Sequence, residues 1–142
     1  MTGNDGLRRR STAFEVESAG GDASYDITDR VNASLAQLEA SSGVARVCVV
    51  GSTVGLTVMR YEEGAVRDLL GVLDAMAPRG RTWDHERTTG DPNGFAHVKC
   101  SLMGTGVLLP VRDRKLDVSA LHRIVLFDFD IHRSSRRVVI DL

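Results

Sequence analysis

The stretch of residues 93–111, NGFAHVKCSLMGTGVLLPV, constrains the fold of this chain more than any other part of the sequence. Asn93 is a typical helix N-cap, and apolar residues follow at helical spacing until Gly104, which can adopt the left-handed conformation that ends a helix. Residues 107–111 are then apolar over the length of a strand. The stretch predicts a helix followed directly by a buried strand, with His97 one turn into the helix.

The rest of the chain predicts more strands than helices. Apolar residues recur every three or four positions after Thr28 and again after Glu62, so two further helices are expected, ending near Ser41 and at Pro78. Residues 44–50 are nearly all apolar, which is typical of a strand buried on both faces. Residues 78–93 are expected to form a long polar loop, and loops of this length are often functional. The expected strands are residues 11–17, 44–50, 54–59, 107–111, 121–129 and 136–142, with a hairpin turn at 112–115.

Length and composition limit the class of protein. A chain of 142 residues with 42% hydrophobic residues is one globular domain, which we place at residues 11–142 after a mobile N-terminal tail of residues 1–10. A formal net charge of −1 gives no general attraction to nucleic acid or to an anionic membrane, so neither is expected as a partner. No segment resembles a membrane span or a signal peptide, and a cytoplasmic location is expected. Cys48 and Cys100 lie in apolar runs and are expected to be buried structural thiols.

Short connections between the expected strands favour an α+β domain with a largely antiparallel sheet. Several short motifs occur in a fixed order and spacing: Asn93, Ala96-His97, residues 101–103, Gly104-Thr105 and Pro110-Val111. In this order and spacing they resemble the YjbQ-type family, whose members are often labelled secondary thiamine-phosphate synthase enzymes. The resemblance extends from about Ala13 to Leu142. It implies packed antiparallel sheets flanked by helices, and a homotrimer with its sites near subunit boundaries.

Members of the family usually carry three histidines that look like a divalent-metal site. Two of them match here: His85 in the run Trp83-Asp84-His85, and His97 after Ala96. The resemblance implies that both are catalytic residues and ligands of zinc or a similar divalent metal. The alternative for each is a surface or hydrogen-bonded histidine that holds no ligand.

Three positions depart from the family pattern. Gly51 stands where the family has its first histidine, and Arg60, a cation that disfavours a metal, stands where the family has a glutamate. His122 stands at the position of a family glutamine. We predict that His122 replaces the missing histidine as the third metal ligand, and the competing account is that these changes record the loss of an unused site.

The expected substrate contacts are polar or cationic residues near these motifs. Arg136 could bind an anion with two hydrogen bonds, although a solvated strand end is the alternative interpretation of that residue. The full set of expected contacts is Ser52, Thr53, Asn93, Thr105 and Arg136.

Two functional hypotheses of different classes follow. The first is an enzyme that acts on a small phosphorylated metabolite, with thiamine-phosphate synthase-like joining of a pyrimidine diphosphate to a thiazole phosphate and a divalent metal to offset phosphate charge. The second is a non-catalytic trimeric binding or scaffold protein that has lost the metal site, and the changes at Gly51 and Arg60 favour it. The amount of metal bound per chain discriminates between the two.

Overall fold

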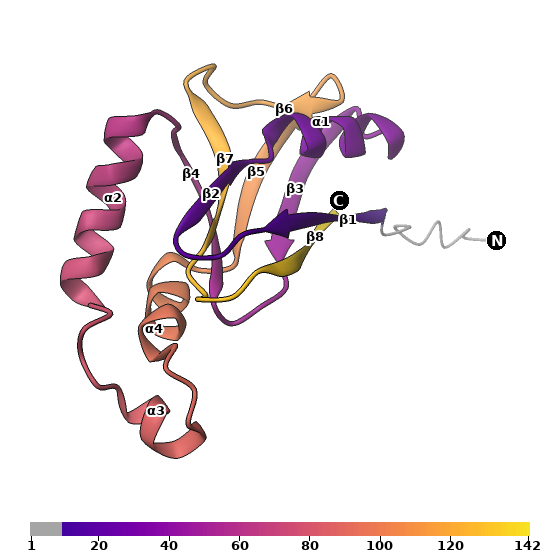
Figure 1. Cartoon of the computed structure of the whole chain (residues 1–142). Helices are drawn as coiled ribbons and strands as arrows, with labels where there is room; N and C mark the ends of the chain where they lie inside the picture. The colour runs from indigo at the N-terminus through magenta and orange to yellow at the C-terminus, as the bar shows by residue number, and fades with distance from the viewer. Residues whose placement is uncertain (1–9) are drawn as a thin grey trace.

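A computed structural model of the chain describes residues 10–142, which form strands in two antiparallel sheets together with helices (Figure 1). The strands are β1 (Ser11–Ser18), β2 (Ala23–Asp26), β3 (Ser42–Val49), β4 (Val54–Arg60), β5 (Gly106–Arg112), β6 (Lys115–Leu116), β7 (His122–Asp128) and β8 (Ser134–Asp141). The helices are α1 (Thr28–Gln37), α2 (Glu63–Met76), α3 (Asp84–Thr89) and α4 (Gly94–Met103).

The two sheets confirm the expected α+β class. The first sheet has the order β1-β8-β3-β5-β6, the second has the order β2-β7-β4, and every pairing in both is antiparallel. Strand β8 lies inside the first sheet, between β1 and β3.

Of the expected N-terminal tail, only Arg10 lies within the described residues, and its guanidinium donates to the carbonyl of Leu38 (2.9 Å) just after α1.

Strand β7 separates two hydrophobic cores. Ile124 and Leu126 point into the core between the two sheets and α1, whereas Val125 and Phe127 point into a second core beneath α2 and α4. All four side chains are at most 1% exposed. Because side chains alternate along a strand, the two faces of β7 contribute to different cores. Burial of each of these side chains stabilises the fold by about 1.5–3 kcal/mol.

Helix α2 lies loosely against the second core. It begins where expected, because the Glu62 carboxylate accepts hydrogen bonds from the amides of Gly64 and Ala65, but of its apolar stripe only Leu73 is buried. The fully buried Lys99 of α4 ties the helix down through an ion pair with Asp74 (2.5 Å). Val66, Leu69 and Leu70 pack against the same core but are only partly buried, so α2 is the least firmly packed of the long helices.

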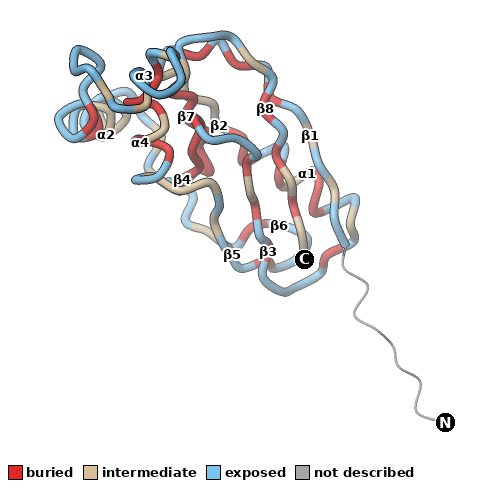
Figure 2. The backbone as a smooth tube through the Cα atoms, turned by 90° about the horizontal axis from the view of Figure 1, so that it is seen from below, coloured by how far each residue is buried: buried red, intermediate tan, exposed pale blue. Residues whose placement is uncertain are grey.

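Residues 78–93, which we expected to form a loop, contain the helix α3. This short helix has no buried residue (Figure 2). It ends at Gly90, whose φ of 76° is left-handed. Six residues are too few to produce a helical hydrophobic pattern, so α3 could not be predicted from periodicity. The short strand β2 is a second element that we did not expect.

Strand β3 is not buried on both faces in a single chain, contrary to expectation. Its inward residues Ala45 and Val47 are fully buried, whereas Val44 on the opposite face is 58% exposed and Val50, just after the strand, is 57% exposed. Cys48 shares that outer face and is half-buried, so only Cys100 meets the expectation of a buried thiol.

None of the helices in residues 10–142 has the length and apolar character needed to cross a membrane.

Candidate functional site

The structure brings two of the three candidate histidines together. The ring centroids of His85 on α3 and His97 on α4 lie 4.4 Å apart, with the ring planes tilted by 59°. The Nδ1 atom of His97 lies 3.0 Å from the carbonyl oxygen of Ser52, in the connection between β3 and β4. A carbonyl can only accept, so Nδ1 carries a proton, and in the neutral ring Nε2 keeps its lone pair. Helices α3 and α4 and the distant β3–β4 connection therefore meet at an imidazole whose free nitrogen can act as a base or as a metal ligand.

Close contact between α3 and α4 depends on Gly94. A Cβ atom on Gly94 would lie 2.5 Å from the Cβ of Trp83 and 3.3 Å from the Cβ of His85. The first of these distances is shorter than real contacts allow, so a side chain at position 94 would push the two helices apart. Glycine at the start of α4 therefore brings His85 within reach of His97.

A buried polar network lies beside the Ser52 connection. Arg136 on β8, 8% exposed, donates to both carboxylate oxygens of the fully buried Asp128, each at 2.8 Å. It also donates to the hydroxyl of Thr53 (3.0 Å), which in turn donates to Asp130 (2.8 Å). Hydrogen bonds to Asp128 hold the pKa of Arg136 above its usual value. The anion that Arg136 binds is thus an aspartate of the same chain, and the interpretation of Arg136 as a solvated strand end is wrong.

Asn93 joins the network instead of capping α4 with its side chain. It occupies the N-cap position, as expected, but its side chain makes no capping bond and is hydrogen-bonded to Asp130. Burial alone would raise the pKa of Asp130, and hydrogen bonds from Thr53, the Ile131 amide and Asn93 bring it below its usual value. Because a carboxylate accepts only, the amide nitrogen of Asn93 faces Asp130, and its buried oxygen has no partner among residues 10–142.

Position 51 has no room for a ligand side chain. A Cβ atom on Gly51 would lie 2.7 Å from Cγ1 of Val54 and 3.1 Å from Nη1 of Arg136. The backbone φ of 155° at Gly51 also disfavours any residue with a side chain. A histidine here would require Val54 and Arg136 to move.

His122 lies at the far end of β7 from the histidine pair. It is the cross-strand partner of Arg60, whereas Asp128, at the opposite end of β7, is the partner of Val54, next to the Ser52 connection. Six residues of strand place His122 about 20 Å from that end. Within one chain the structure therefore does not bring His122 to His85 and His97. In residues 10–142, no three His, Cys, Asp or Glu side chains form a group that could hold a metal ion.

The other expected contacts are split between surface and interior. Ser52 is exposed next to the pair and Thr105 is half-buried, but Thr53 and Asn93 are only 3% and 5% exposed, so their polar atoms face the protein.

Asp128 was not predicted from the sequence. Its signal is a charged residue inside the apolar run 124–129, because a charge buried in a strand needs a partner.

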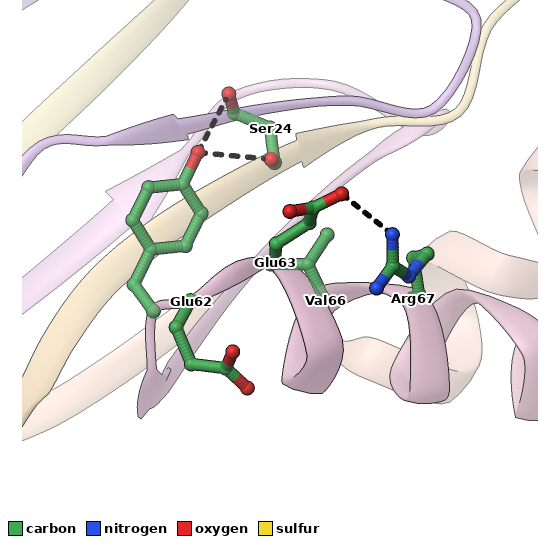
Figure 3. A pocket seen from close by; sticks show the side chains of 6 residues that line it. Ser24, Glu62, Glu63, Val66 and Arg67 are labelled. Atoms are coloured by element: carbon green, nitrogen blue, oxygen red, sulfur yellow. Dashed lines mark hydrogen bonds and ion pairs between the residues drawn. The ribbon is translucent and has the colours of Figure 1, made fainter.

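A separate hollow lies at the opposite end of β4. It has a volume of about 370 Å³ and lies between β2 and the start of α2, with the hydroxyl of Tyr61 reaching the hydroxyl (3.0 Å) and the carbonyl (3.2 Å) of Ser24 (Figure 3). Glu63 on its rim pairs with Arg67 (2.5 Å). The length of β4 separates this hollow from the histidine pair, so it is not part of the candidate site.

Comparison with known proteins agrees with the fold. A UPF0047 protein of Archaeoglobus fulgidus is 33% identical over 114 residues, which cover 80% of this chain and 86% of the relative. The YugU protein of Bacillus subtilis, also a UPF0047 protein, is 27% identical over 119 residues, or 82% of this chain and 87% of the relative.

Solved structures give the same result. An uncharacterized conserved protein of the YjbQ/UPF0047 family from Clostridium acetobutylicum is 26% identical and superimposes with a TM-score of 0.81 over 91% of this chain and 97% of that one. A YbjQ-like protein of unknown function from Sulfolobus solfataricus has a TM-score of 0.83 over 94% and 97% of the two chains, and its 23% identity supports the fold alone. The family model described as "UPF0047 protein YjbQ-like" matches residues 12–142. The chain therefore belongs to the YjbQ-like UPF0047 family.

Proposed function

We propose that the protein binds a small phosphorylated metabolite at the His85–His97 pair, through a divalent metal that the two imidazoles and the ligand share. The observation that carries the proposal is the hydrogen bond from His97 to the Ser52 carbonyl, which leaves Nε2 of His97 unprotonated beside the second ring. A hydrogen bond of this kind, from the other ring nitrogen to a backbone carbonyl, is typical of histidines that bind metals.

The residues fit a metal with two protein ligands. His85 and His97 supply imidazole nitrogens, the ligand type that suits zinc and similar divalent ions. Gly51 supplies nothing and is closely surrounded, so the remaining coordination positions are left for oxygen atoms of the ligand. When bound, the metal would offset the negative charge of a phosphate group. The exposed Ser52 next to the pair is the nearest candidate for a direct polar contact.

Thiamine-phosphate synthase-like transfer is the reaction that we propose to assay first. In it a pyrimidine diphosphate is joined to a thiazole phosphate and diphosphate leaves, so both substrates carry the phosphate groups that the site would bind. The second candidate is a non-catalytic binding or scaffold protein. The specific observation in its favour is Gly51, because Val54 and Arg136 fill the space into which a third ligand side chain would extend.

The experiment is a zinc titration by calorimetry, with and without inorganic diphosphate, on the wild type and on single histidine variants. We expect one zinc per chain, bound more tightly with diphosphate present, and a loss of at least tenfold in affinity in His85→Ala and in His97→Ala. His122→Ala is the matched control, since it removes the same side chain about 20 Å away, and it should bind zinc as the wild type does. Zinc binding that none of these variants alters, or no zinc binding at all, would reject the metal-dependent proposal in favour of the scaffold.

A loss of zinc affinity in His122→Ala would have a different meaning. Because His122 cannot reach the pair within its own chain, such a loss would require His122 from a neighbouring copy to complete the site. Combining the variant with a subunit carrying His97→Ala would then restore part of the binding in mixed oligomers.

We also propose that the protein is a homotrimer that covers the outer face of the first sheet. That face carries three large exposed side chains, Val44, Val50 and Leu108, the last of them 69% exposed. Apolar residues on both faces of β3 are typical of a strand that is covered on both sides. Sedimentation should give a trimer, and Leu108→Asp should dissociate it while the equally polar change Leu121→Asp, outside this face, does not. A stable monomer of the wild type at micromolar concentration would refute the trimer.

The expected cytoplasmic location stays a prediction.

A further inference from the structure

We propose that Thr53 is a positioning residue, which fixes the connection at residues 51–53 so that the Ser52 carbonyl holds the ring of His97 in the Nδ1–H tautomer. This role rests on the proposed function, because the tautomer is what leaves Nε2 of His97 free to bind. Thr53 itself is 3% exposed and has no access to a ligand.

The hydroxyl of Thr53 is held in one orientation. It receives a hydrogen bond from Nη2 of Arg136 (3.0 Å) and donates one to Oδ2 of Asp130 (2.8 Å). An arginine can only donate and a carboxylate can only accept, so the direction of both bonds is determined by chemistry. The hydroxyl proton therefore points to Oδ2 of Asp130, and hydrogen bonds to Arg136 and to Asp130 hold the side chain in place.

The backbone of Thr53 is anchored as well. Its carbonyl accepts a hydrogen bond from the amide of Phe129 (2.9 Å), the residue just after β7. Ser52 is the next residue back, and its carbonyl is the acceptor for Nδ1 of His97. Two tertiary hydrogen bonds of the side chain and one of the backbone therefore fix the residue that follows the carbonyl.

The exposed surroundings of His97 make this restraint necessary. The hydrogen bond between His97 and Ser52 lies at the surface, where water competes for both partners and where a free imidazole exchanges its proton between the two nitrogens. A carbonyl on a mobile turn would not select one tautomer. A carbonyl held by the buried network would.

Loss of the Thr53 hydroxyl should leave the rest of the network in place. The two hydrogen bonds between Arg136 and Asp128 do not involve Thr53, so this ion pair persists when valine replaces threonine. Asp130 keeps its bonds to Asn93 and to the Ile131 amide. The change Thr53→Val is close to isosteric, and it tests the hydroxyl itself.

The test is long-range ¹H–¹⁵N NMR of the histidine rings in metal-free protein at pH 8, where an ordinary imidazole with a pKa of about 6.5 is neutral. In the wild type, His97 should show a protonated Nδ1 and an unprotonated Nε2. Thr53→Val should shift His97 towards a mixture of tautomers and weaken zinc binding by about 10–100-fold, the usual effect of losing an outer partner of a metal ligand. Thr53→Ser, which keeps the hydroxyl, should restore both.

Thr57→Val is the matched control, because it removes a threonine hydroxyl from β4 that has no hydrogen-bond partner in the described part of the chain. It should change neither the tautomer nor zinc affinity. An unchanged His97 tautomer in Thr53→Val would overturn the inference, even if the variant is less stable. If the wild type shows the expected tautomer but binds no zinc, the proposed function fails and the positioning role of Thr53 is still decided by the tautomer of the variant.

Discussion

Removing the guanidinium of Arg136 should destabilise the protein far more than removing an exposed arginine from the same sheet. In Arg136→Met, the Asp128 carboxyl group would stay in a position with no exposure to water and would lose its cationic partner together with two hydrogen bonds of 2.8 Å. Of the hydrogen bonds that the Asp128 carboxyl group accepts from described residues, the one from the Asp130 amide (3.1 Å) would remain. Breaking a buried ion pair on one side typically costs about 3–5 kcal/mol, and we expect a loss in this range.

The control is Arg46→Met on the neighbouring strand β3. Arg46 forms an ion pair with Asp141 of β8, but its side chain is 47% exposed. Exposed ion pairs contribute about 0–1 kcal/mol, so this variant should lose no more than that. The free energy of unfolding is measured by urea denaturation followed by circular dichroism.

A third variant separates the ion pair from simple loss of packing. Replacing both partners with apolar residues, in Arg136→Met/Asp128→Leu, removes the uncompensated charge, and such replacements are often neutral or stabilising. The double variant should therefore be more stable than Arg136→Met alone. The reasoning is refuted if Arg136→Met costs no more than Arg46→Met, or if the two single losses simply add.

Three further predictions concern the turn, the acid range and the thiols. The β5–β6 hairpin turns through Asp113 and Arg114, both at positive φ (51° and 64°), so the double change to Asn-Gly should raise the free energy of unfolding by about 1–2 kcal/mol in the same urea assay. Because the folded-state pKa of Asp130 lies below its usual value, its stabilisation is present above about pH 4 and is lost as the pH falls through the folded pKa; Asp130→Asn should therefore flatten the acid side of a stability–pH profile, and an unchanged profile would contradict this. Cys100 is buried, which raises the pKa of its thiol, so a maleimide should label half-buried Cys48 first in native protein; faster labelling of Cys100 would show that the order is wrong.

The order and type of most elements could be predicted from the sequence because their signals are local. Residues 93–111 form α4, a stop at Gly104 and β5 as expected, since apolar spacing and the freedom of glycine to adopt a positive φ (87° at Gly104) act within one or two turns of chain. The hairpin at 112–115 is present for the same reason. Helix α3 was missed because its six residues contact the rest of the protein through a few side chains and leave no periodic pattern.

The candidate site could be predicted only in part, because its determinants lie far apart in sequence. The motifs identified His97 and His85, whose rings do lie close together. The hydrogen-bond partner of Nδ1 of His97, however, is the carbonyl of Ser52, 45 residues away in sequence. Backbone groups carry no sequence signature. Within one chain His122 does not reach the pair, and this could not be predicted because spacing along a strand does not reveal which of its two ends a side chain will share with another element. That His122 of a neighbouring copy completes the site stays a prediction.

The position of β8 has a consequence for how the protein is made. This strand is synthesised after every other described element, yet it lies between β1 and β3 and pairs with both, joining Ser11 to Asp141 across most of the chain. Until residues 134–141 have left the ribosome, β1 has no partner in its sheet and the Arg136 network cannot form. Contacts between residues so distant in sequence slow folding, because a long loop must close before they stabilise anything. Until then β1 and one edge of β3 stay unpaired in the nascent chain. The apolar strands β3 and β5 are the segments that a chaperone would have to cover in that interval.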